Sequence, residues 1–566
     1  MVRKKILKSI LWSSFVFIAI FLIVLAYLII AISIENPTIK DHSIEKIERF
    51  NPSPNFYTLG NNWLRKSDSG LWEMYIEGDG FERGVAIGKL TKELAEKQEL
   101  AFVKQIKKQV PSDNYLYFLK YFVAYFNREL PEYITEEYQQ EIYGVSLYAS
   151  DKFDFIGPKY YRILNYHAAH DIGHALQDKN MTVGCTSFAA WKDRSEDGKM
   201  IVARNFDFYL GDEFAENKII CFCKPTTGYK FTYITWAGFT GVVSGMNDQG
   251  LTVTINSSKS DIPSHAATPI SLLAKEILQY SKNINEAMAI AKKRTTFVSE
   301  SILIASKNDG KSFIIEKTPT ITNLYSEDRN ILVCTNHFQS QLFKNDLTNN
   351  KNILESSSIY RKFRMEELLK QNPKINYRNA VKILRNQNGM NDKHIGFTNE
   401  KGVNQLIAHH SVILKPEDGL LWVSTQPFQL GKFVCYDFNK VFNDAQHITG
   451  KNEIIENDKT IPDDPFLHSQ QYVDYKLFLK LKEYIQEITK SEFNLTIDKK
   501  KIDKFILTNP ESYYTYWIVG NYFKKEGDIN NAVANYKIAL TKEVATKKEA
   551  EQIQELLKTC TKKLIH

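Results

Sequence analysis

The chain has 566 residues, of which 43% are hydrophobic, 25% charged and 13% aromatic. This length exceeds one ordinary domain and predicts two or three units with sizeable cores. The net charge of +7 is small and spread along the chain, whereas nucleic-acid-binding proteins concentrate basic residues in one stripe. We therefore expect no nucleic-acid partner, and six cysteines are too few for a disulfide scaffold.

The N-terminus has the pattern of a membrane anchor. Basic residues occur among positions 1–8, and positions 10–34 carry no charge. These 25 positions are enough to cross a bilayer, which takes about 20 residues. The basic flank favours a cytoplasmic N-terminus. We expect residues 1–34 to be a basic flank and a single-pass transmembrane signal anchor, with the catalytic domain on the exported, periplasmic or extracytoplasmic side. A cleaved signal peptide is the alternative.

The middle of the chain changes character twice. Residues 35–70 are polar, contain Asn, Pro and Ser, and predict a linker. Residues 71–184 predict a short strand at 72–76 followed by helices. From 185 to 450, runs of β-branched and aromatic residues separated by turn signals predict strands, with helices at 269–293 and 355–370. This order predicts an α+β catalytic core of layered antiparallel sheets.

Residues 460–566 predict helices to the C-terminus. Part of this tail matches the tetratricopeptide pattern in residue type and spacing, at Tyr516, Val519, Gly520, Phe523, Gly527, Ala532, Tyr536 and Ala539. One motif is not an array, because repeats bury their faces against neighbouring repeats. We expect a single unit docked on the catalytic domain, with contact to a protein partner as a further role.

The dipeptide Gly184–Cys185 lies at the start of a strand-like segment, far from both termini. Cleavage of the bond between these residues would give Cys185 a free α-amine beside its own thiol. One residue would then hold both the nucleophile and its base. The sequence therefore predicts a protein that cleaves itself at this position.

Five polar residues downstream are candidates for the same site. Arg204 and Asp207 are expected on one strand face, where the Arg lowers the thiol pKa and the Asp holds the new ammonium. Asn256 and Asn336 close predicted strands, and side-chain amides there are suitable oxyanion donors. Arg361 opens a predicted helix and is expected to face the site. Each of these residues also has a structural explanation when taken singly. Arg204 and Asp207 could form a salt bridge, Asn256 and Asn336 could be turn residues, and Arg361 could be a surface residue.

Taken together, these motifs resemble those of the N-terminal-nucleophile hydrolases. The likeness rests on residues 184–188, 203–208 and 335–338, on Asn256, and on Ser358-x-x-Arg361, within about residues 71–440. The motifs resemble those of the isopenicillin-N acyltransferase (acyl-CoA:6-aminopenicillanate acyltransferase) branch more closely than those of the choloylglycine hydrolases. The resemblance implies a four-layer αββα sandwich made as a precursor, in which residues up to Gly184 form the small chain after cleavage. It also implies that no metal or organic cofactor is needed.

The resemblance further implies roles for individual residues. Cys185 would be the nucleophile, Arg204 and Asp207 would orient it, Asn256 and Asn336 would supply oxyanion contacts, and Arg361 would be an accessory polar residue. The expected activity is hydrolysis or formation of linear amide C–N bonds through an acyl-enzyme. Because the predicted anchor holds the site near a membrane, we expect a small-molecule N-acyl or lipidic substrate.

Two other functions fit parts of the sequence. His167, His170 and His174 have helical spacing and, with Asp171, resemble the core of metal-dependent HD phosphohydrolases. Structural histidines near the cleavage site are the other interpretation of this cluster. A membrane-tethered tetratricopeptide adaptor with an inactive hydrolase domain is the non-enzymatic alternative.

Overall fold

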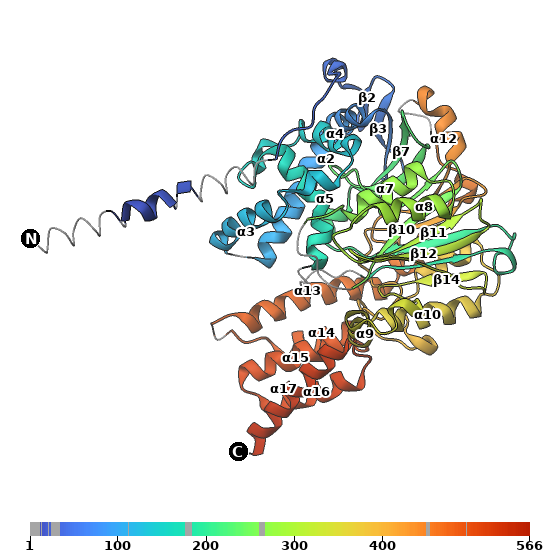
Figure 1. The fold of residues 1–566 in the computed structure, drawn as a ribbon. Coiled ribbons are helices and arrows are strands. Elements are labelled where there is room, and N and C mark those ends of the chain that lie inside the picture. The colour runs from blue at the N-terminus through green and yellow to red at the C-terminus, as the bar shows by residue number, and fades with distance from the viewer. Residues whose placement is uncertain are drawn as a thin grey trace, which may run out of the picture.

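The computed structural model describes residues 12, 14–20, 22–23, 34–110, 112–175, 184–259, 266–448, 453–493 and 495–565. Two β-sheets form the centre of the molecule, helices cover them, and a separate group of helices follows at the C-terminal end (Figure 1). Mixed α+β architecture is therefore confirmed.

The larger sheet has eleven strands in the order β1-β2-β3-β4-β7-β8-β9-β10-β11-β12-β13. Neighbouring strands run antiparallel, except that β4 pairs with β7 in parallel. The strands span Phe50–Ser53, Phe56–Leu59, Asn62–Lys66, Trp72–Gly78, Ile219–Pro225, Phe231–Thr235, Ser244–Asn247, Leu251–Ser257, Glu300–Ser306, Lys311–Lys317 and Thr322–Tyr325, in the order of the sheet.

The smaller sheet has six antiparallel strands in the order β14-β5-β6-β15-β16-β17. Alternate residues of a strand point to opposite faces. Ala189 of β5 accordingly packs in the core between the two sheets, whereas Phe188 and Ala190 pack on the other face of the sheet. The strands span Ile331–Cys334, Thr186–Ala190, Ile201–Phe206, His410–Lys415, Leu420–Ser424 and Phe433–Asp437, in the order of the sheet.

Helices cover the outer face of each sheet. The larger sheet shares a hydrophobic core with α2, α4, α5, α7 and α8, and the smaller sheet shares one with α10 and α11. A third core fills the space between the sheets. The result is four layers, helix–sheet–sheet–helix. These helices span Gly80–Gln109, Glu136–Ser146, Lys159–Ala175, Ile270–Tyr280, Ile284–Lys293, Ser358–Gln371 and Tyr377–Leu384.

The structure differs from the sequence expectations in several elements. Residues 50–66, expected within a linker, form β1–β3 at the edge of the larger sheet, because Phe56, Trp63 and Leu64 are buried against its core. The helix expected at 269–293 is two helices, since α7 ends at Tyr280 and the Asn283 side chain caps α8. The helices α3 (Asp113–Phe126) and α9 (Leu347–Glu355) and the short helix α6 (Asp212–Ala215) also belong to this part of the chain.

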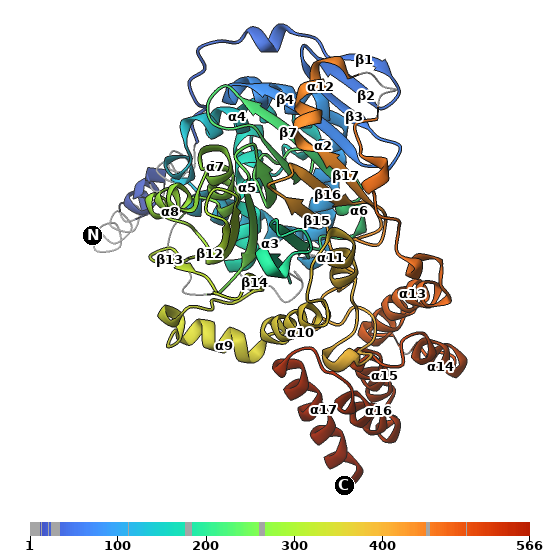
Figure 2. The same ribbon diagram turned by 90° about the vertical axis from the view of Figure 1, so that its right-hand side faces the viewer.

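The C-terminal tail is helical, as expected (Figure 2). Helices α15 and α16 form a hairpin in which Gly527 takes the left-handed conformation, with φ of +80°. A Cβ on Gly520 would lie 2.6 Å from the Tyr536 ring, so the glycine permits the close approach of the two helices. The tetratricopeptide assignment itself stays a prediction. The short helix α12 spans Phe438–Asp444. The tail helices α13 to α17 span, in this order, Gln470–Lys490, Lys499–Thr508, Tyr513–Glu526, Ile529–Thr541 and Lys547–Ile565.

Most of the predicted transmembrane segment at 10–34 lies outside the described residues. Within the described part of the chain, no helix is both long and apolar enough to cross a bilayer.

Candidate active site

Cys185 directly precedes β5, which lies next to the edge strand β14 of the smaller sheet. Ser187, two residues after Cys185, pairs with Arg204 of β6 on one side and with Cys334 of β14 on the other. This register brings the Arg204 side chain to the thiol. The sheet therefore fixes the position of both groups.

Arg204 is buried and donates a hydrogen bond to the Cys185 Sγ over 3.4 Å. Its other donors bind the Val243 carbonyl at 2.6 Å, the Ser244 hydroxyl at 2.5 Å and the Ile255 carbonyl. The guanidinium also lies 4.4 Å from the centre of the Phe206 ring. These contacts hold the cation in one orientation beside the sulfur.

Burial raises the pKa of the Cys185 thiol, and the opposing effect of the Arg204 charge is smaller. Arg204 lowers the thiol pKa, as expected, but burial outweighs this effect, so the net shift in the uncleaved chain is upward. The physical reason is that the side chain lies in the core, where desolvation disfavours the thiolate. A base is needed to ionise this thiol.

Asp207 follows β6, which ends at Phe206, so the carboxylate lies past the strand end and not on the strand face with Arg204 as expected. Burial raises the pKa of Asp207 to about 7, opposed by the charges of Arg361 and Arg204. Its Oδ2 accepts a hydrogen bond from Gln405 Nε2 at 3.3 Å, and its Oδ1 has no hydrogen-bond partner among the described residues. The backbone carbonyl of Asp207 accepts from the Gly184 N–H at 3.1 Å. Asp207 is thus a buried carboxyl group with unused acceptor capacity next to the predicted cleavage position.

Arg361 of α10 binds the Gly184–Cys185 segment directly. Its Nη1 lies 3.0 Å from the Gly184 carbonyl oxygen, 2.8 Å from the Cys185 carbonyl oxygen and 2.7 Å from the Thr186 hydroxyl. Its Nη2 donates to Asn336 Oδ1 at 2.7 Å. An arginine expected to have an accessory role therefore makes more contacts with this segment than any other predicted residue.

Gln405 is a site residue that the sequence did not indicate. It lies between α11 and β15, and its Nε2 is 3.0 Å from the Gly184 carbonyl oxygen. The side chain is buried. It belongs to no motif and is 221 residues from Gly184, so only the fold brings the two together.

Asn256 and Asn336 are both buried and lie around the same segment, but their amides have other partners. Asn256 Nδ2 donates to the Cys334 carbonyl at 3.1 Å, and its Oδ1 accepts from Ser187 Oγ. Asn336 Nδ2 donates to the carbonyl and the hydroxyl of Ser257 at 2.9 and 3.1 Å. In this arrangement Asn336 positions Arg361, and Asn256 joins strands β5 and β14.

An aromatic cluster leads away from Arg204. Phe206 and Phe208 stack with ring centres 5.5 Å apart, and Phe208 lies 6.2 Å from Trp236. Trp236 in turn stacks on Phe239 at 4.3 Å and is half-buried. The three phenylalanines are buried in the hydrophobic core that also contains Cys185, and Trp236 packs against this core.

His167 has a structural role in this fold. The Thr240 N–H donates to His167 Nε2 at 2.9 Å, so the proton is on Nδ1, which lies 2.9 Å from the Ile163 carbonyl. Burial lowers the pKa of His167 to about 4. With both ring nitrogens in use, His167 is not available as a metal ligand here. The side chains of His170, Asp171 and His174 lie outside the described residues, and the described part of the chain holds no cluster of three metal-ligating side chains.

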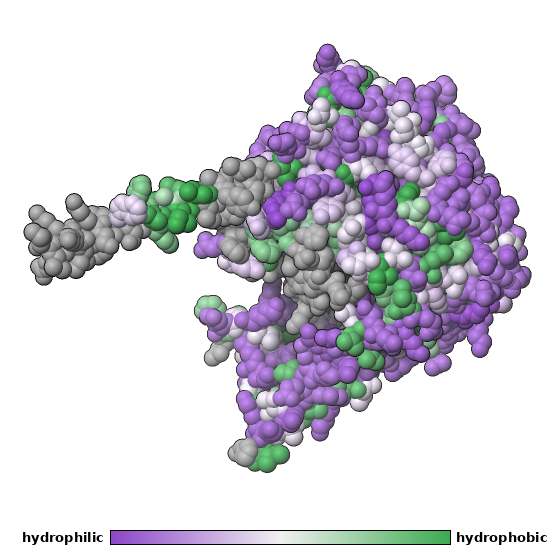
Figure 3. Space-filling view, in the orientation of Figure 1, coloured by the Kyte–Doolittle hydropathy of each residue, from purple (hydrophilic) through white to green (hydrophobic). Residues whose placement is uncertain are grey.

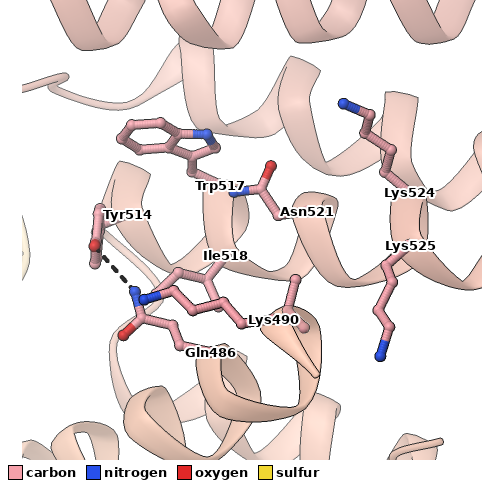
Figure 4. Close-up of a pocket in the computed structure, with 9 residues that line it drawn as sticks. Gln486, Lys490, Tyr514, Trp517, Ile518, Asn521, Lys524 and Lys525 are labelled. Carbon is pink, nitrogen blue, oxygen red and sulfur yellow. Dashed lines mark hydrogen bonds between the residues drawn. The ribbon is translucent and has the colours of Figure 1, made fainter. Parts of the chain in front are cut away.

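A cavity of about 440 Å³ lies in the tail, between α13 and α15 (Figure 4). Tyr514 and Trp517 line it, and Gln486 Nε2 donates to the Tyr514 hydroxyl at 3.2 Å. No residue of the Cys185 site lines this cavity.

Comparison with known proteins finds a family that matches part of the chain. Residues 194–424 match the family described as acyl-coenzyme A:6-aminopenicillanic acid acyl-transferase. The match supports the N-terminal-nucleophile hydrolase superfamily. It includes Arg204, Asp207, Asn256, Asn336 and Arg361 and begins after Cys185.

Individual relatives are distant. An uncharacterised protein of Archaeoglobus fulgidus is 25% identical over 240 residues, which are 40% of this chain and 39% of the relative. The chain thus spans about two-fifths of the length of that relative. Among solved structures, the N-acylethanolamine-hydrolyzing acid amidase (NAAA) ortholog of Caenorhabditis elegans is 19% identical, with a TM-score of 0.30 over 41% of this chain and 93% of that one. A mutant of the conjugated bile acid hydrolase of Clostridium perfringens is 14% identical, with a TM-score of 0.31 over 48% and 95%.

Proposed function

We propose that the chain is a self-processing cysteine amidohydrolase or N-acyltransferase that acts on linear amides through an acyl-enzyme on Cys185. The observation that carries the proposal is the convergence of two buried arginines on one dipeptide. Arg204 binds the Cys185 sulfur, and Arg361 binds the carbonyl groups on both sides of the Gly184–Cys185 junction. Buried cations placed on a sulfur and on a carbonyl oxygen stabilise negative charge on both atoms.

In the mature enzyme, Cys185 would carry a free α-amine that takes the thiol proton directly or through water. The thiolate attacks the substrate carbonyl carbon, the amine half of the substrate leaves, and Cys185 becomes acylated. Water then releases an acid, or a second amine accepts the acyl group. Asp207, whose Oδ1 has no partner among the described residues, holds the new ammonium group.

An apolar acyl group suits the surroundings of the nucleophile. The aromatic cluster of Phe206, Phe208, Trp236 and Phe239 offers stacked rings close to Arg204. Burial of apolar substrate surface against such rings favours binding by about 25 cal/mol per Å². We therefore include long-chain N-acyl amines among the substrates to be tested.

The test is to incubate the purified full chain with N-acyl amides of increasing acyl length and to follow amine release. Mass spectrometry after rapid acid quenching should find the acyl group on the peptide that begins with Cys185. Absence of turnover on every amide and thioester tried, in protein whose large fragment begins at Cys185, would contradict the enzymatic proposal.

We also propose that residues 1–34 anchor the enzyme in a membrane. Support comes from the apolar side chains that the described part of this segment exposes, such as Trp12, Phe15, Phe17 and Ile23 (Figure 3). Membrane fractionation of the full chain and of a chain starting at residue 35 tests this, because only the full chain should sediment with membranes.

A further inference from the structure

The carbonyl oxygen of Gly184 receives two hydrogen bonds from buried side chains. Arg361 Nη1 and Gln405 Nε2 each lie 3.0 Å from it. Both side chains are at most 3% exposed, so water does not screen these contacts. The oxygen belongs to the peptide bond that the proposed self-cleavage would break.

Gln405 also explains why a glycine precedes the cysteine. The backbone of Gly184 does not require a glycine, since its φ lies outside the left-handed region. A Cβ at this position, however, would lie 2.5 Å from Gln405 Nε2 and 3.1 Å from its Oε1. The glycine is therefore needed for the close approach of this amide to the chain.

The backbone next to Gln405 is held in a costly conformation. Leu406 has a φ of +57°, a left-handed conformation that is strained for a residue other than glycine. The Asn404 side chain stabilises the turn by accepting a hydrogen bond from the Leu406 N–H at 3.0 Å. The strained residue Leu406 thus directly follows Gln405, whose side-chain amide binds Gly184.

One end of the Gln405 amide binds the cleavage segment, and the other end is unused among the described residues of the uncleaved chain. Gln405 Oε1 is buried and, like Asp207 Oδ1, has no partner among the described residues. Leaving such a buried acceptor unpaired is unfavourable, because it has lost its hydrogen bonds to water. Cleavage before Cys185 creates an ammonium group with three N–H donors at this place, which would supply the missing partners.

We propose that Gln405 is a catalytic residue of self-cleavage, where its amide acts with Arg361 as the oxyanion donor pair for the Gly184 carbonyl. This inference rests on the proposed function. In the cleavage, the Cys185 sulfur forms a bond to the Gly184 carbonyl carbon, and the thiol proton passes to Asp207. The carbonyl oxygen becomes an oxyanion between the two donors.

Collapse of this intermediate breaks the bond between the Gly184 carbon and the Cys185 nitrogen. The nitrogen takes up the proton and becomes the α-amine, and Gly184 is held as a thioester on the Cys185 sulfur. Water then hydrolyses the thioester, which releases the Gly184 carboxyl group and restores the thiol. Gln405 donates to the same oxygen in both tetrahedral intermediates.

The test measures the rate of cleavage in full chains made by cell-free translation and quenched at intervals. Gln405→Met keeps a side chain of similar length and removes the donor, so cleavage should slow by about 10²–10³-fold. Gln429→Met is the matched control, because Gln429 is an equally buried glutamine whose amide has no partner among the described residues. Its cleavage rate should equal that of the wild type.

Gln405→Glu provides a second variant that keeps the shape of the side chain. Its carboxyl group donates to the Gly184 oxygen only when protonated, and the charged groups that face it are Asp207 and Arg361. The ratio of variant to wild-type rate should therefore rise as the pH falls. A Gln405→Met chain that cleaves at the wild-type rate, or a Gln405→Glu ratio independent of pH, overturns the inference while the proposed function stands. A wild-type chain that stays intact overturns both.

Discussion

Cys185 and Cys334 are both buried free thiols in one region of the smaller sheet. Cys185 directly precedes β5, and Cys334 ends the neighbouring strand β14. Burial raises the pKa of each. They differ in their surroundings, since Cys185 receives the Arg204 guanidinium and is followed by a carbonyl bound by Arg361, whereas the Cys334 sulfur contacts the Thr335 carbonyl at 3.8 Å. The two thiols are therefore distinguished not by their location in the sheet but by the polar groups that converge on Cys185.

The strongest way to break this comparison is to remove each sulfur in turn. Cys185→Ala should lower amide turnover by about 10⁶-fold, the size of effect found when a catalytic nucleophile is removed. Cys334→Ala removes a sulfur of equal burial and should leave turnover within a few-fold of the wild type. Amine release by both purified variants checks this, and equal turnover of the two would show that the nucleophile is elsewhere.

A similar pair exists among the arginines of α10. Arg361 and Arg364 are both buried, but Arg361 binds the cleavage segment while Arg364 pairs with Glu367 and Asp392. Arg361→Lys retains the charge, loses the branched donor geometry, and should slow self-cleavage by about 10²-fold. Arg364→Lys should affect thermal stability and leave the cleavage rate unchanged. Timed denaturing gels of the two variants decide between a role for Arg361 in the site and a general role in packing.

The raised pKa of Asp207 predicts a pH-dependent stability. A carboxyl group whose folded pKa is about 7 binds its proton more tightly in the folded state than in the unfolded state, where the pKa is near 4. The contribution of Asp207 to the free energy of unfolding is therefore fully present below pH 4. As the pH rises from about 4 to about 7, the free energy of unfolding falls by up to about 4 kcal/mol. Denaturant unfolding of the uncleavable Cys185→Ala chain, with and without Asp207→Asn, should show a stability difference that changes over this interval. A difference constant with pH would contradict the buried, shifted carboxyl group.

The smallest effect is expected in the tail, which contains no residue of the site. Gly520→Ala places a Cβ against Tyr536 and should destabilise the α15–α16 hairpin by about 1–3 kcal/mol. Self-cleavage and amide turnover should not change. Thermal unfolding measured beside the cleavage rate tests this, and a parallel loss of cleavage would mean that the tail supports the site.

Local sequence patterns were sufficient to predict most core strands and the approach of Cys185 and Arg204. Runs of β-branched and aromatic residues between turn signals predicted most strands of the core, and the hairpin of β5 and β6 brought Cys185 and Arg204 together as expected. β1–β3 were missed because their turns and polar residues have the composition of a linker, although Trp63 is buried by distant residues.

Other features of the site depend on long-range packing and were not predictable. Gln405 reaches Gly184 from a loop with no periodic pattern. The direction of the Cys185 pKa depends on how deeply the fold buries the thiol, which spacing does not reveal. Residue type and order thus indicated the chemistry, and the fold determined which donors bind the cleavage segment.

The central claim is that this chain cuts itself between Gly184 and Cys185. The most direct measurement is N-terminal sequencing of the large fragment from purified wild-type protein, beside Cys185→Ala. We predict a wild-type fragment that begins with Cys185-Thr186-Ser187 and an intact Cys185→Ala chain. An intact wild-type chain, or a fragment that begins at another residue, would contradict the claim.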